Sequence, residues 1–183
     1  VPLGVPLYAT SATMSPAVLV EVCRTLHINT SYSFHLNLGN DRPNVTQEVQ
    51  IISSPMDYSA LDFLVKDVGT PKKIPQALIF VNTINQSQAG FRRLHKMLPA
   101  RLKGQVDFLN SPRTRKTVLQ DFCDGKIRAM FVTEIGGIGP DIPDIELVIQ
   151  FGVPPSLTVW LQRADQAACH FSLQGQAILM VEE

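Results

Sequence analysis

Residues 76–98 read QALIFVNTINQSQAGFRRLHKML. The run QALIFV is uninterrupted, apolar and β-prone, which is typical of a strand buried on both faces of a parallel sheet. After the polar turn, Phe91, Leu94 and Leu98 recur at the spacing of one helix face. The stretch therefore predicts a strand followed by a helix, the repeating unit of an α/β fold.

The same alternation continues on both sides of this stretch. Further strands are predicted at 45–53, 105–109, 128–133, 146–151 and 176–181, with a short one at 5–10. Helical spacing occurs at 16–26, 56–68, 111–122 and 156–168, with Ser15 as a candidate cap for the first helix. Such alternation predicts a mainly parallel sheet with helices on both faces and function at the carboxyl ends of its strands.

Composition limits the classes of protein that remain. The 183 residues suffice for one compact domain with a short appendage, and no apolar run approaches the roughly 18 residues that cross a bilayer. Lysine plus arginine equals aspartate plus glutamate at 16 each, which argues against a charge-driven nucleic-acid binder. The basic stretches at 92–103 and 113–116 are interpreted by default as solvated helix faces, with phosphate contact, which needs such residues, as the alternative.

Cysteines and histidines provide no metal site. The three cysteines are far apart, which indicates a reducing, intracellular compartment, and the four histidines lack ligand spacing. Trp160 lies among leucines and is assigned to the core. We also find no secretory signal, no GxxxxGK[ST] phosphate loop and no DExH or DExD string, so we expect that the chain does not bind ATP by itself in the usual way.

Three polar turns are candidate site elements, each with an ordinary alternative. Ser11-Ala12-Thr13 can be a plain turn before a helix cap, and the glycine-rich string at 131–151 can be a connection without a ligand. Gln162 and Arg163 lie near a helix exit, where polar residues are usually on the surface.

Taken in order, these motifs resemble the RecQ family of superfamily 2 helicases. The resemblance rests on SAT (11–13), NDRPN (40–44), ALIFVNT (77–83), the segments at 111–134 and 137–154, LQRA (161–164) and QGQAILMVE (174–182). It implies a three-layer RecA-like α/β domain at 46–183, the second helicase lobe. Residues 1–45 are then the detached tail of a first RecA-like lobe with the interlobe connector.

The resemblance also implies roles for individual residues. Asn82 and Thr83 match a motif that grips the DNA backbone, and Thr133 matches a second DNA-contacting position. A further set is expected on the ATP-facing side of the interlobe cleft: Ser11, Thr13, Gly137, Gly139, Asp141 and Gln162. A strand-end threonine can donate to a phosphate oxygen, and glycines allow close approach.

The sequence departs from the family in its sixth motif, Q-x-x-G-R-x-G-R. Gln162 is kept, but Gln166 and Cys169 occupy the two arginine positions and Asp165 replaces a glycine. Arg163 is not at an arginine position of this pattern. Such arginine fingers accelerate phosphoryl transfer roughly 10³ to 10⁵ fold, so the catalytic arginine motif is degenerate.

We therefore expect a fragment of an ATP-dependent 3′–5′ DNA helicase of RecQ type. ATP and Mg²⁺ are expected only when a first lobe is present, and the isolated chain is expected to be inactive. Expected partners are single-stranded or partly duplex DNA and the missing first lobe, without a membrane, in an intracellular setting that is nuclear in a eukaryote. The alternatives are an inactive helicase-like module that binds nucleic acid or protein, and a decayed gene product without function.

Overall fold

The computed structural model describes residues 6–11, 14–36, 42–109, 112–133, 142, 144–170 and 172–183, with 112–115 described for their backbone alone. The chain forms two compact units, Val1–Asp41 and Arg42–Glu183. In the first unit, the Ser15 hydroxyl accepts from the Val18 amide at 3.3 Å and so caps α1 (Pro16–Thr25), as the sequence predicts. A short 3₁₀ helix, η1 (Thr30–Tyr32), follows.

The second unit is built on a six-stranded parallel sheet. Its strand order is β1-β6-β5-β2-β4-β3, and every recorded pairing is parallel. The strands are β1 (Val45–Ile51), β2 (Ala77–Val81), β3 (Val106–Phe108), β4 (Ala129–Val132), β5 (Leu147–Phe151) and β6 (Gly175–Val181). The predicted mainly parallel α/β sheet is thereby confirmed, and three strands, β2, β4 and β5, lie side by side at its centre.

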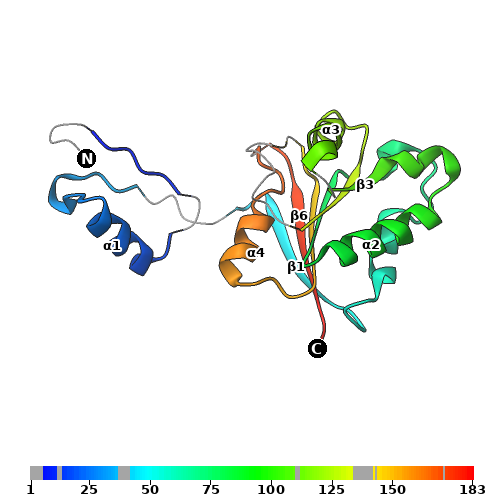
Figure 1. Ribbon diagram of the computed structural model, residues 1–183, viewed down its shortest axis with the longest axis horizontal. Coiled ribbons are helices and arrows are strands. Elements are labelled where there is room, and N and C mark those ends of the chain that lie inside the picture. The colour runs from blue at the N-terminus through cyan, green and yellow to red at the C-terminus, as the bar shows by residue number, and fades with distance from the viewer. Residues whose placement is uncertain are drawn as a thin grey trace. The chain divides into compact units, whose positions relative to one another are not determined.

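Helices cover both faces of the sheet, which gives three layers. On one face lie η2 (Tyr58–Leu64), η3 (Pro71–Lys73), α2 (Ile84–Met97) and η4 (Ala100–Gln105). Apolar side chains of η2, α2 and η4, with Ile74 after η3, join one core cluster. On the other lie α3 (Pro112–Cys123) and α4 (Leu157–Ala164), which contribute Phe122, Trp160 and Ala164 to a second cluster. Figure 1 shows α2 and α4 on opposite sides of the sheet.

The central strand β2 explains why both clusters form. All five of its residues are buried, with Leu78 and Phe80 in one cluster and Ala77, Ile79 and Val81 in the other. Because successive side chains of a strand point to opposite faces, a continuous apolar run supplies two cores at once. The same register brings the carboxyl ends of β2, β4 and β5 to one edge.

Two predicted elements differ in the structure. The strand predicted at 5–10 does not form in its described part, 6–10, where Leu7 and Tyr8 are exposed. The helix predicted at 56–68 is regular only as the 3₁₀ helix η2, in which the buried residues Leu61 and Leu64 are three positions apart. That spacing matches the three residues per turn of a 3₁₀ helix. In the part of the chain that the structure describes, no helix is long and apolar enough to cross a membrane.

Candidate functional site

A cavity of about 520 Å³ opens where the central strands end. Asn82 and Thr83 follow β2, Thr133 follows β4, and Val153 and Pro155 follow β5; with Ile84 and Arg163 they line the cavity. The structure thus brings together the three predicted backbone-contacting residues, Asn82, Thr83 and Thr133. Their binding role remains a prediction, but their common position at the carboxyl edge agrees with the general rule for open α/β sheets.

The N-terminus of α2 forms one wall of this cavity. Thr83 caps the helix: its hydroxyl accepts from the Gln86 amide at 3.2 Å, and the Gln86 side chain accepts from the Asn82 and Thr83 amides at 3.0 Å each. The positive end of the helix dipole therefore faces the cavity. Such helix ends favour anionic groups, phosphate among them.

Asn82 is held by the turn that follows β5. Its Nδ2 donates to the Val153 carbonyl at 2.9 Å. This approach depends on Gly152, which has a φ of +87° and whose added Cβ would lie 3.2 Å from Asn82 Nδ2. Asn82 Oδ1 also accepts from Gln150 Nε2 at 3.4 Å, so the strand ends are joined by side-chain hydrogen bonds.

Arg163 supplies the positive charge of the site. It is only 4% exposed, whereas the sequence predicted a surface residue, and that prediction is wrong. Its Nη1 donates to Gln150 Oε1, its Nη2 donates to the Thr133 carbonyl at 3.4 Å, and its guanidinium lies 4.9 Å from the centre of the Phe80 ring. A cation over an aromatic ring combined with donation from both Nη atoms suits arginine rather than lysine.

The helical position of Arg163 could have revealed its burial. It is three residues after the buried Trp160 and four before the buried Ala167, so it lies on the inner stripe of α4 and its continuation. A buried arginine beside a hydroxyl, an amide and a helix N-terminus makes the cavity suited to a phosphate group. Gln150, fully buried, was not singled out because β5 otherwise looks like an apolar strand.

The predicted ATP-facing set is only partly placed. Thr13, Gly137, Gly139 and Asp141 lie outside the described residues. Ser11 belongs to the first unit, whose position relative to the second is not determined, and Gln162 is exposed on α4. The structure therefore does not bring this predicted set together.

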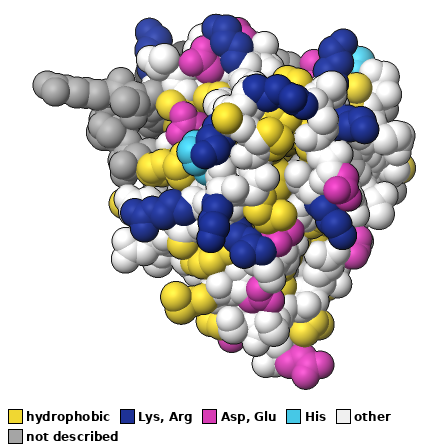
Figure 2. Space-filling view, turned by 90° about the vertical axis from the view of Figure 1, so that its right-hand side faces the viewer, with side chains coloured by type: hydrophobic (Ala, Val, Ile, Leu, Met, Phe, Trp, Pro, Cys, Tyr) yellow, Lys and Arg dark blue, Asp and Glu magenta, His cyan; other side chains and the backbone are white. Residues whose placement is uncertain are grey.

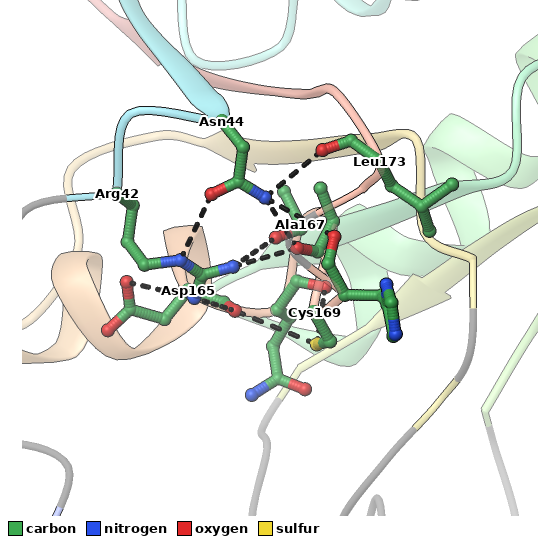
Figure 3. Close-up of polar contacts among 9 residues, drawn as sticks. Arg42, Asn44, Asp165, Ala167, Cys169 and Leu173 are labelled. Carbon is green, nitrogen blue, oxygen red and sulfur yellow. Dashed lines mark hydrogen bonds and ion pairs between the residues drawn. The ribbon is translucent and has the colours of Figure 1, made fainter.

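The segment after α4, which carries the degenerate motif, is held by two residues from the start of the second unit (Figure 3). Arg42 donates through Nη1 to the Asp165 carbonyl at 3.3 Å, and through Nη2 to the Ala167 and Ala168 carbonyls at 3.2 and 2.8 Å. Asn44 Nδ2 donates to the Ala168 and Leu173 carbonyls at 2.9 and 3.1 Å. A cation at a helix C-terminus satisfies carbonyls that the helix leaves open.

In this segment Ala168 adopts a backbone conformation that glycine usually adopts. Ala168, at a glycine position of the family pattern, has a φ of +45°, which side-chain-bearing residues rarely adopt. Its Cβ packs against Gly175, where an added Cβ would lie 2.8 Å away. The close approach of β6 therefore also fixes the segment.

Neither arginine position of the degenerate motif carries a cation. Gln166 and Cys169 are uncharged, and burial raises the pKa of Asp165, an effect that Arg42 partly offsets from 3.9 Å. Gln166 and Cys169 thus cannot supply the charge that a finger arginine provides, and we derive no hydrolytic step from them. Within the described residues, no three His, Cys, Asp or Glu side chains gather as a metal site.

Comparison with known proteins gives one family. The family model "Helicase conserved C-terminal domain" matches residues 59–170. The chain is 25% identical over 157 residues to a putative DEAD-box ATP-dependent RNA helicase 44 of Arabidopsis thaliana, which covers 86% of this chain and 25% of that protein. It is 34% identical over 71 residues to human ATP-dependent DNA helicase Q4, which covers 35% of the chain and 6% of that protein.

Solved structures with a similar fold are also helicases. The structure of S. cerevisiae Dbp5 L327V bound to RNA and ADP BeF3 superposes with a TM-score of 0.74 at 19% identity, over 94% of this chain and 44% of that one. The chain spans about a quarter of the length of the plant relative. The predicted RecA-like α/β fold is confirmed, whereas a RecQ type is not, because matches to RNA helicases cover more of the chain.

Proposed function

Because this chain belongs to the helicase conserved C-terminal domain family, we propose that it is the second lobe of an ATP-dependent helicase and holds the nucleic-acid backbone. The observation that carries the proposal is the cavity in which the α2 N-terminus, Thr133 and the buried Arg163 converge. One phosphate there meets a helix dipole, a hydroxyl and a guanidinium. These groups contact the backbone rather than bases, so the lobe binds without reading sequence.

The type of nucleic acid remains part of the proposal. Relatives named as RNA helicases match over most of the chain, which favours RNA. The second candidate is the RecQ-type 3′–5′ DNA helicase, which is supported by the order of the sequence motifs and by the 34% identity to helicase Q4 over 71 residues. Affinities for RNA and DNA single strands of one sequence separate the two candidates.

Thr133→Val tests the cavity with an isosteric change. The variant removes a hydroxyl donor and keeps the shape of the side chain, so we expect affinity for a single-stranded oligonucleotide to fall about fivefold to tenfold, as for one lost hydrogen bond. Fluorescence anisotropy at low salt measures it. Thr46→Val, at an exposed position of the edge strand β1, is the matched control and should leave affinity unchanged. Equal affinities for the two variants contradict the proposed site.

The isolated chain is expected to release no phosphate from ATP. Gln166 and Cys169 provide no positive charge, and the sequence contains no phosphate loop to bind the triphosphate. ATP and Mg²⁺ would be held by a first lobe, which supplies the hydrolytic chemistry in the parent protein. Steady-state phosphate release with saturating single-stranded nucleic acid measures this. The expectation is contradicted if ATP turnover co-purifies with the chain and is faster than that of a heat-denatured sample.

A further inference from the structure

Charge is unevenly distributed along this neutral chain. Residues 66–103 contain eight of its 16 lysines and arginines but only one of its 16 acidic residues, Asp67. The segment therefore has a net charge of +7, and the remainder has −7. The chain is neutral overall, but its positive and negative charges are separated along the sequence. This matters for binding because the local electrostatic potential, rather than the net charge, attracts a polyanion.

The fold gathers this charge in one layer. The segment forms η3, α2 and η4. Ile74 and Leu98, which follow η3 and α2, and Leu102 of η4 share one core cluster on a single face of the sheet. Arg101, at the start of η4, donates through Nη2 to the Gly69 carbonyl at 3.0 Å, which joins η4 to the turn before η3. We call the outer surface of this layer the basic face: Lys66, Lys72, Lys73, Arg92, Lys96, Arg101 and Lys103.

Few acidic groups oppose the basic face. Arg93 is left out of it because Asp62 pairs with its guanidinium. Among the described residues, no ion pair engages any member of the basic face, and the acidic residues in or next to the layer are Asp57, Asp62, Asp67 and Asp107. Figure 2 looks onto this side: lysine and arginine side chains are spread across its width, among apolar side chains and some acidic ones.

Helix α2 connects the basic face to the cavity. Its N-terminal residues Thr83 and Ile84 line the cavity, and Arg92 and Lys96 lie one turn apart on its exposed surface. At 1.5 Å per residue, Arg92 is about 12 Å along the helix from Ile84. A strand bound at the cavity would reach the basic face after about three to four nucleotides, at 3.4 Å per phosphate.

We propose that the basic face is a second nucleic-acid contact, which binds the phosphate backbone of a strand that leaves the cavity along α2. The inference extends the proposed function of the lobe. Phosphate is favoured over an acidic protein surface because the lysines and arginines are spread over one long face instead of surrounding an apolar pocket. The same chemistry serves a single strand or one strand of a duplex.

The test is the salt dependence of binding by Arg92→Ala/Lys96→Ala. With a 20-nucleotide single strand, we expect the slope of log K against log salt to become shallower by about 1.4, which corresponds to two lost phosphate contacts, and about 1.8 with a duplex. A two-nucleotide strand, which ends before it reaches Arg92, should bind both proteins alike. Arg24→Ala/Lys126→Ala removes the same net charge outside the basic face and should leave every slope unchanged.

Each outcome has a defined meaning. An unchanged slope in Arg92→Ala/Lys96→Ala, an equal change in the control pair, or no binding of the 20-nucleotide strand by the unmodified chain overturns the inference. Displacement of the long strand by polyglutamate at equal charge concentration overturns it as well and assigns the face to acidic protein. A third outcome is a shallower salt slope in Arg92→Ala/Lys96→Ala together with unchanged affinity in Thr133→Val. That outcome supports the basic face and refutes the cavity as the proposed site.

Discussion

Arg42→Ala is expected to lower the free energy of unfolding by about 2–3 kcal/mol. The guanidinium is donor to three backbone carbonyls after α4, those of Asp165, Ala167 and Ala168, and alanine leaves them without it. Urea unfolding followed by circular dichroism measures the change. Arg24→Ala, which breaks only an exposed ion pair in α1, is the matched control and should cost less than about 0.5 kcal/mol.

The deficit of Arg42→Ala should depend on pH. Burial raises the pKa of Asp165 and the attraction of Arg42 lowers it in part, so the folded pKa is above the unfolded value. The stability from the protonated carboxyl is complete below the unfolded pKa and is lost as pH rises through the folded pKa. Without Arg42 the charged carboxylate has lost its partner, so the deficit should be larger at pH 7 than at pH 4. A deficit no larger than that of Arg24→Ala at both values contradicts this account.

Arg163→Met should have the second large effect, a loss of about 3 kcal/mol and a fall in Tm of about 6–12 °C. The change leaves the buried Gln150 Oε1 without its guanidinium donor and removes the contact with the Phe80 ring. Thermal unfolding measures it. The fall in oligonucleotide affinity should exceed that of Thr133→Val, because a charge rather than a hydroxyl is removed from the cavity.

A double variant separates the two roles of Arg163. Gln150→Leu/Arg163→Met replaces both polar partners with apolar side chains, so it should lose less stability than the sum of the two single changes. It should bind nucleic acid no better than Arg163→Met. Additive stability losses would contradict the Gln150–Arg163 contact, and restored binding would contradict a charge-based role in the cavity.

The fold was predictable because its signals are local. The buried run in β2 and the helical spacing in α2 each determine an element without knowledge of distant partners. Residues 6–10 misled for the opposite reason, since a short apolar run becomes a strand only when a neighbouring strand pairs with it. The segment at 56–68 has apolar spacing that both an α-helix and a 3₁₀ helix satisfy, and only packing decides between them.

The site was predictable at strand ends and less so elsewhere. Asn82, Thr83 and Thr133 converge because parallel strands end at one edge. Arg163 was misjudged because arginine usually lies on the surface, although its place on the inner stripe of α4 indicated burial. Its contacts with Gln150 and Phe80, which lie on other elements, were not indicated by the helical pattern. The contacts of Arg42 and Asn44 span more than 120 residues, and no periodicity in the sequence indicates them.

The most direct test of the central claim is an amide chemical-shift map of the ¹⁵N-labelled chain during titration with a four-nucleotide single strand. A backbone-holding cavity at the carboxyl edge predicts that the largest changes occur at Asn82, Thr83, Thr133 and Val153, which line it. The account is contradicted if these four amides stay unmoved at millimolar oligonucleotide, or if the changes gather only on the edge strand β1, far from the cavity in the strand order.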